Sequence, residues 1–186
     1  MIARRKFVSK KVLVISTSLR RGGNSERLAK EFAKGVQEAG HYVEMLDLHD
    51  KSIGFCIGCL ACQKTGRCVI HDDANAIIQK MMIADAIVFV TPIYFYEMSG
   101  QMKTLLDRTN PLFPSDYAFR DIYLLATAAE IEERAIDGAI EGLTGWIDCF
   151  EKARLKGVIR SVGVTDIGDI IGNRALDEAY ELGKTL

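Results

Sequence analysis

The sequence alternates short apolar runs, rich in β-branched residues, with longer segments whose apolar residues recur at helical spacing. This alternation restricts the possible fold more than any other feature. The runs Val12-Leu13-Val14-Ile15 and Ala86-Ile87-Val88-Phe89-Val90 are apolar throughout, which is typical of parallel strands buried on both faces. Helices must then lie between successive strands and cover both faces of one sheet.

The pattern predicts five strands with intervening helices. The strands are expected near residues 12–15, 42–46, 86–90, 122–126 and 157–164. Short, right-handed connections make a doubly wound, five-stranded parallel sheet in a three-layer α/β/α arrangement the simplest fold for them. At 186 residues the chain is expected to be one domain, residues 1–186, with residues 1–10 as a flexible N-terminal extension.

The composition disfavours several classes of partner. With 24 basic and 25 acidic residues the net charge is −1, so no strong field attracts nucleic acid or an acidic membrane, and a small-molecule partner is expected. The sequence has no apolar stretch long enough for a membrane span and no apolar core of signal-peptide length. We therefore expect a soluble, cytoplasmic protein.

The loop after the first strand, residues 16–25, is suited to a phosphate group. Ligands of doubly wound sheets bind beyond the carboxyl ends of the strands, where this loop is expected. The hydroxyls of Ser18 and Ser25, the amide of Asn24 and the guanidinium of Arg20 can surround a dianion together with free N–H groups at the helix start. The alternative is that Asn24 or Ser25 only caps the helix.

The loop expected after the third strand, residues 91–100, carries Tyr94, Phe95 and Tyr96 in succession. A surface loop is ordinarily polar, so three aromatic residues here indicate a flat, apolar ligand. Pro92 makes the turn rigid, and the backbone from Ile93 to Phe95 can hydrogen-bond the edge of a heteroaromatic ring. The alternative is that the aromatic residues form a minor core cluster or a subunit contact.

Four of the five cysteines lie close together, as Cys56, Cys59, Cys62 and Cys68. Two successive Cys-x2-Cys steps and a short return segment can bring four thiolates to one point, which suits an iron–sulfur cluster and, less well, zinc. Free or disulfide-forming thiols are the third alternative. A disulfide framework is not expected, because such groupings in a reducing compartment more often hold metal or do redox chemistry.

Two further expectations concern the surroundings of the cysteines. Lys64 and Arg67 lie within the cysteine loop and are expected to favour thiolates over thiols. Cys149 stands apart from the other four and is expected to be a buried packing residue.

These motifs together resemble the flavodoxin-like, NADPH-dependent FMN reductases and, within them, the iron–sulfur flavoproteins. The resemblance covers roughly residues 11 to 126. It rests on the loop Ser18-Leu-Arg-Arg-Gly-Gly-Asn-Ser25, on the cysteine loop continuing to Asp72-Asp73, and on residues 91–95 followed by residues 101–108.

The resemblance implies a flavodoxin-like fold that binds FMN. Ser18, Arg20, Asn24 and Ser25 match the phosphate loop of the family, and Pro92, Ile93, Tyr94 and Phe95 match the segment that lines the isoalloxazine. Thr127 and Ala128 are expected to make weaker contacts, because relatives usually have paired glycines after this threonine and alanine adds a methyl group. The resemblance also implies a homodimer or homotetramer.

We therefore expect an FMN-dependent oxidoreductase that passes electrons from NAD(P)H or a carrier to a small acceptor, such as a quinone, free flavin or a ferredoxin-like partner. The hydride chemistry belongs to the cofactor, so no side chain is named as acid or base. In the iron–sulfur flavoproteins, a cysteine motif of this spacing holds a [4Fe-4S] cluster that passes electrons to FMN, and this is the main alternative. A non-enzymatic carrier of flavodoxin type is disfavoured by the neutral charge, and a redox or metal sensor is a further alternative.

Overall fold

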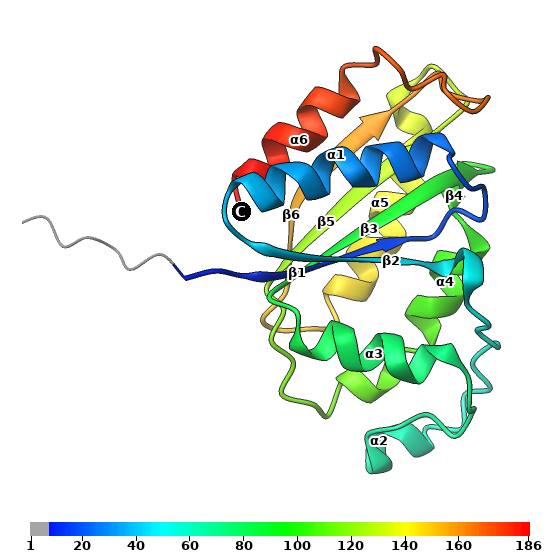
Figure 1. The fold of residues 1–186 in the computed structure, drawn as a ribbon. Coiled ribbons are helices and arrows are strands. Elements are labelled where there is room, and N and C mark those ends of the chain that lie inside the picture. The colour runs from blue at the N-terminus through cyan, green and yellow to red at the C-terminus, as the bar shows by residue number, and fades with distance from the viewer. Residues whose placement is uncertain (1–7) are drawn as a thin grey trace, which may run out of the picture.

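The computed structural model describes residues 8–186, which form a twisted parallel sheet with helices on both faces (Figure 1). The strands of the main sheet are β1 (Lys11–Ser16), β2 (Tyr42–Asp47), β3 (Ala86–Tyr94), β5 (Asp121–Thr127) and β6 (Arg154–Ser161). Their order in space is β2-β1-β3-β5-β6, and all neighbouring pairs run parallel. The predicted doubly wound, five-stranded parallel sheet is confirmed.

The helices separate into two layers, as the α/β/α prediction requires. One face is covered by α1 (Asn24–Glu38) and α6 (Ala175–Lys184), and the other by α3 (Asp73–Ile83), α4 (Gly100–Asp107) and α5 (Asp137–Ile147). The shorter helical segments are α2 (Ala61–Thr65), η1 (Leu48–Asp50), η2 (Asn110–Leu112) and η3 (Glu133–Ile136). Within residues 8–186, none of the helices is long and apolar enough to cross a membrane.

Successive residues of the central strands supply the two halves of the core. In β1, Leu13 and Ile15 pack on the side of α3, α4 and α5, whereas Val12 and Val14 pack on the side of α1 and α6. This is why the strand is apolar at every position: each face of the sheet is buried.

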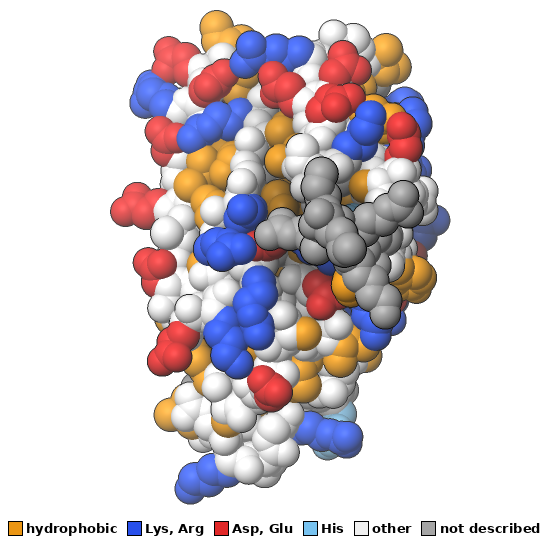
Figure 2. Space-filling model, turned by 90° about the vertical axis from the view of Figure 1, so that its left-hand side faces the viewer, with side chains coloured by type: hydrophobic (Ala, Val, Ile, Leu, Met, Phe, Trp, Pro, Cys, Tyr) orange, Lys and Arg blue, Asp and Glu red, His pale blue; other side chains and the backbone are white. Residues whose placement is uncertain are grey.

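On the face of the molecule shown in Figure 2, basic and acidic side chains are interspersed.

The third strand is longer than the sequence predicts. Residues 91–94 continue β3, with Thr91 beside Ala126 and Pro92 beside Thr127 of the neighbouring strand. The chain then turns back into the two-residue strand β4 (Glu97–Met98), which pairs antiparallel with β3. The prediction of a loop from residue 91 is wrong. Proline ordinarily lies at the end of a strand, but β3 continues through Pro92.

Part of the predicted N-terminal extension, Ser9 and Lys10, is hydrogen-bonded to the rest of the fold. Residues 1–7 lie outside the described residues. The Ser9 hydroxyl donates to the carbonyl of Gly40 at 3.0 Å, and the N–H of Tyr42 donates to the carbonyl of Lys10 at 3.0 Å. The prediction of a flexible segment is therefore wrong for Ser9 and Lys10, which are tied to the start of β2.

Helices α1 and α6 pack with their backbones in contact, and two glycines permit this. A Cβ atom on Gly35 of α1 would overlap the carbonyl group of Tyr180, and one on Gly183 of α6 would overlap the carbonyl group of Phe32. The position of α6 on the sheet therefore depends on the absence of side chains at these positions.

We predict that Gly35→Ala and Gly183→Ala each lower the free energy of unfolding by about 1–3 kcal/mol or more, because the added methyl must push the helices apart. Gly145→Ala in α5 is the matched control, since a Cβ there meets no atom within 4 Å and alanine raises helix propensity by up to about 1 kcal/mol. Urea unfolding of the three variants and the wild type measures these changes in the free energy of unfolding. Equal stability of the Gly35→Ala and Gly145→Ala proteins would contradict the close packing.

Candidate functional site

The carboxyl ends of β1, β3 and β5 lie side by side, because β3 stands between the other two strands. The loops that follow these strands, together with a segment after β6, line one cleft. Its lining residues are Ser18, Arg20, Gly23, Asn24, Ser25, Pro92, Ile93, Tyr94, Thr127, Ala129, Val164 and Thr165. The cleft thus brings together all the predicted flavin-site residues except Phe95 and Ala128.

Helix α1 begins at this cleft without a side-chain cap. Its N-cap residue is Gly23, which offers no side chain to the first N–H groups, so the alternative that Asn24 or Ser25 caps the helix is wrong. The chain reaches this position through Gly22, at a φ of +65°, a conformation that glycine adopts without strain. Uncapped N–H groups and the positive end of a 15-residue helix form a site for an anion.

Asn24 and Arg20 hold a further loop against the cleft. The buried Asn24 amide donates to the carbonyl of Asp166 at 2.9 Å and accepts from the N–H groups of Gly168 and Ile170. The Arg20 guanidinium donates to the carbonyl of Thr165 at 2.7 Å. The sequence motif implied direct phosphate contacts for these side chains. In the structure they position the loop after β6, which adds Val164 and Thr165 to the cleft.

Two buried hydroxyl pairs join the loops to one another. The hydroxyls of Ser25 and Thr127 lie 2.7 Å apart, and those of Thr17 and Ser99 lie 2.9 Å apart. Thr17 also donates to the carbonyl of Val90 at 3.0 Å. The loop after β1 is therefore connected to the loop after β5 on one side and to the start of α4 on the other.

The turn between β3 and β4 has an unusual backbone. Its two central residues, Phe95 and Tyr96, have φ values of 50° and 65°, a pattern that ordinarily selects Asn-Gly. Each aromatic residue in this conformation costs on the order of 1–3 kcal/mol. The side chains diverge: Tyr94 lines the cleft, Phe95 is 101% exposed, and the Tyr96 ring lies against Arg134.

This divergence excludes the predicted alternative of a core cluster formed by the three aromatic residues. Phe95 faces an adjoining hollow with Ala128 and Ala129 rather than the cleft itself. Ala128 is buried, with its N–H bonded to the carbonyl of Ser161 and its own carbonyl bonded to the N–H of Val164. Of the two alanines, Ala129 is the one that lines the cleft. The predicted subunit contact of the aromatic turn stays a prediction.

The four clustered cysteines line a second, small hollow, together with Arg108. All four are free thiols; Cys56 and Cys59 are exposed, Cys68 is partly buried and Cys62 is buried. Among residues 8–186, no three His, Cys, Asp or Glu side chains lie close enough to hold a metal ion. The thiols therefore surround a common space without the tight grouping that a single zinc ion requires.

Burial, and next to it the neighbouring Cys68, raises the pKa of the Cys62 thiol. The prediction that Lys64 and Arg67 favour thiolates in this loop stays a prediction, whereas the prediction for Cys149 is wrong. Cys149 is exposed rather than buried, and its Sγ donates to the carbonyl of Gly145. Its neighbours Ile147 and Phe150 take the buried side of the chain.

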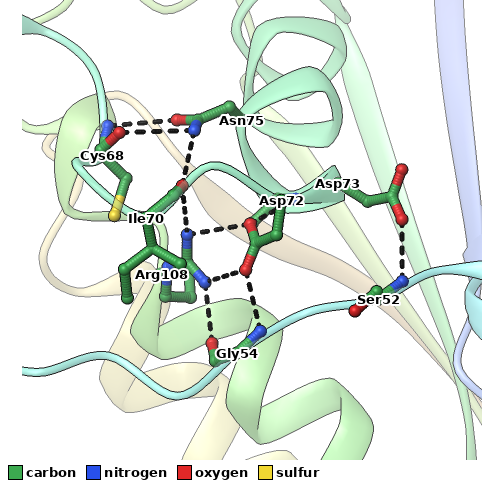
Figure 3. A network of polar contacts seen from close by, with 9 residues as sticks. Ser52, Gly54, Cys68, Ile70, Asp72, Asp73, Asn75 and Arg108 are labelled. Atoms are coloured by element: carbon green, nitrogen blue, oxygen red, sulfur yellow. Dashed lines mark hydrogen bonds and ion pairs between the residues drawn. The ribbon is translucent and has the colours of Figure 1, made fainter.

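The cysteine loop is closed at its base by an ion pair (Figure 3). The buried Arg108 guanidinium contacts the Asp72 carboxylate at 2.6 and 3.0 Å, and it also donates to the carbonyls of Gly54 and Ile70. Asp72 in turn accepts from the N–H groups of Gly54 and Ala74, and it is the N-cap residue of α3. Burial alone would lower the pKa of Arg108, but the Asp72 carboxylate and then the Cys68 thiol raise it.

We predict that Asn24→Ala lowers the free energy of unfolding of the ligand-free protein by about 1–3 kcal/mol, because it removes the three hydrogen bonds by which the buried Asn24 side chain holds the 166–170 segment. Asn110→Ala is the control, since Asn110 makes one exposed side-chain hydrogen bond, to the carbonyl of Asp107. Urea unfolding compares the two. A loss for Asn24→Ala no greater than for Asn110→Ala would show that Asn24 does not hold this loop.

Comparison with known proteins links the cleft to flavoenzymes. An iron-sulfur flavoprotein of Methanocaldococcus jannaschii is 42% identical over 102 residues, which are 55% of this chain and 53% of that protein. The match therefore spans about half of that relative. An iron-sulfur flavoprotein of Archaeoglobus fulgidus is 28% identical over 177 residues, or 95% of this chain and 78% of the relative.

Solved structures share the fold. An NAD(P)H:quinone oxidoreductase from Methanothermobacter marburgensis aligns with a TM-score of 0.77 at 17% identity, covering 96% of both chains. A flavodoxin from the domain Archaea aligns with a TM-score of 0.59 at 14% identity, covering 94% of both. The sequence profile of the NADPH-dependent FMN reductases matches residues 10–150. Because this match covers most of the chain, including the loops after β1, β3 and β5 and the cysteine loop, the chain belongs to the NADPH-dependent FMN reductase family.

Proposed function

We propose that this protein binds FMN in the cleft and passes electrons from NAD(P)H to a small acceptor such as a quinone or free flavin. The observation that carries this proposal is the uncapped start of α1 at the carboxyl edge of the sheet, beside Ser18 and Ser25. A phosphomonoester is an anion with several acceptor oxygens, and such a helix terminus supplies the donors that it needs.

The remaining lining suits the flavin ring. Pro92, Ile93 and Tyr94 form an apolar wall at the end of β3, and Thr127 and Ala129 continue it at the end of the neighbouring strand β5. The hydroxyl of Thr127 lies 2.7 Å from that of Ser25, so this part of the wall is tied to the start of α1. The strained turn at Phe95 and Tyr96 presents Tyr94 at the rim of the cleft.

Bound FMN supplies hydride acceptance from the nicotinamide and onward electron transfer. The chain's own part is to bind and orient. The described residues that line the cleft carry hydroxyl, amide and guanidinium groups, which can donate hydrogen bonds to a bound ligand. The Arg20 guanidinium is the cleft's one cationic side chain, and it supports an anionic ligand while it holds Thr165.

We predict that protein purified without oxygen contains FMN, that NADH or NADPH bleaches its visible absorbance, and that a quinone added afterwards restores it. The two half-reactions proceed separately because one cleft serves both substrates in turn. Stopped-flow spectroscopy measures each step. Release of FAD instead of FMN on denaturation would contradict the proposed cofactor, and FMN that neither nucleotide reduces would favour the non-enzymatic carrier.

A second candidate function is that of an iron–sulfur flavoprotein with a [4Fe-4S] cluster in the cysteine loop. The supporting observation is that Cys56, Cys59, Cys62 and Cys68 line one hollow. Four cysteine thiolates are the usual ligands of a [4Fe-4S] cluster. Relatives named iron-sulfur flavoproteins support the same proposal.

We predict about four irons and four acid-labile sulfides per chain after anaerobic preparation, as a [4Fe-4S] cluster requires. Cys59→Ser should reduce both contents sharply, because it removes one of the four thiolate ligands. Cys149→Ser is the matched control and should leave both unchanged, since Cys149 does not line the hollow. Iron near zero in protein with full FMN occupancy would contradict the cluster and leave a simple flavin reductase.

A further inference from the structure

Arg108 occupies a buried position, where a cation loses its hydration at a large cost in free energy. It directly follows α4, and its side chain has no exposed surface. A buried guanidinium must be neutralised and fully hydrogen-bonded to be tolerated. The Asp72 carboxylate meets the first need, with contacts at 2.6 and 3.0 Å. The second is met only in part.

The terminal nitrogens of Arg108 hold the two ends of the cysteine loop. Nη1 donates to the carbonyl of Gly54 at 2.7 Å, two residues before Cys56, and Nη2 donates to the carbonyl of Ile70 at 3.3 Å, two residues after Cys68. Asn75 fixes the same end, because it accepts from the N–H of Cys68 and donates to the carbonyls of Cys68 and Ile70. Figure 3 shows Gly54, Ile70 and Asp72 around the Arg108 guanidinium, with Asn75 bonded to Cys68 and Ile70.

The third nitrogen is unused. Nε of Arg108 is buried and has no hydrogen-bond partner. The same side chain lines the hollow among the four cysteines. A buried N–H without an acceptor is rare in folded proteins and indicates a ligand or another function.

We propose that Arg108 is a positioning residue for the cluster: its Nη atoms close the base of the cysteine loop, and its Nε–H donates a hydrogen bond to a sulfur of the cluster or of a ligating cysteine. This inference rests on the proposed [4Fe-4S] cluster. A hydrogen bond to sulfur and a nearby positive charge stabilise the more negative, reduced form of such a group. Arg108 therefore raises the reduction potential of the site, and Asp72, as its counter-charge, limits this effect.

The test compares the cluster's midpoint potential in three variants. Arg108→Lys keeps the charge but removes Nε–H and the forked contacts, so the potential should fall. Asp72→Asn removes the counter-charge, so the potential should rise. A purely structural role predicts no such opposite shifts. Arg120→Lys is the matched control, because the Arg120 guanidinium donates to the carbonyls of Tyr117, Ala118 and Phe119 and does not line the hollow; its potential should equal that of the wild type.

Iron analysis of the wild type separates the two proposals. Wild-type protein without iron overturns the proposed cluster and this inference with it. Wild-type protein with about four irons, in which Arg108→Lys retains the wild-type potential or Asp72→Asn does not raise it, overturns the inference alone. If Arg108→Lys does not fold, which its FMN content and circular dichroism report, the direction of the shift in Asp72→Asn decides.

Discussion

The adjacency of β1, β3 and β5 is the constraint on which the rest of the structure depends. Parallel strands end at the same edge of a sheet, so three loops distant in sequence meet at one place. Buried hydroxyl pairs, Ser25 with Thr127 and Thr17 with Ser99, then join these loops directly. The cleft is consequently lined by loops that are hydrogen-bonded to one another.

Helix α4 connects this cleft to the cysteine loop. Its N-cap residue, Ser99, lies against Thr17 beside the phosphate loop, and Arg108, directly after its last turn, closes the cysteine loop. The helix has eight residues, a length of about 12 Å. A rigid element of this size holds the cleft and the cysteine loop at a fixed separation. FMN alone would leave the buried Nε of Arg108 without a hydrogen-bond partner.

Much of this arrangement can be predicted from the sequence. The strands and helices follow from apolar periodicity, and most of the cleft residues follow from loops whose polar or aromatic character is out of place at the end of a buried strand. The predictions are wrong where the local sequence pattern and the tertiary structure disagree. Pro92 ordinarily ends a strand, yet β3 continues through it, and Phe95 and Tyr96 adopt positive φ values that their residue types disfavour.

Other features carry no local signal at all. Val164 and Thr165 reach the cleft because Arg20 and Asn24 bind the backbone of residues 165 and 166. These partners are about 140 positions apart in the sequence, and no local motif predicts the contact. Arg108 reads as an ordinary residue at a helix end, and its importance appears only when Gly54 and Ile70 are brought together around it. Homo-oligomer formation and a cytoplasmic location stay predictions.

The central claim is that the start of α1 is a phosphate site that selects FMN. Titration calorimetry of the flavin-free protein with FMN and with riboflavin, which lacks the phosphate, tests it most directly. Two or more charge-assisted hydrogen bonds of about 1.5–3 kcal/mol each correspond to an affinity for FMN at least about 100-fold greater than for riboflavin. Equal affinity for the two flavins would contradict the account, because the ring would then bind without any help from the helix terminus.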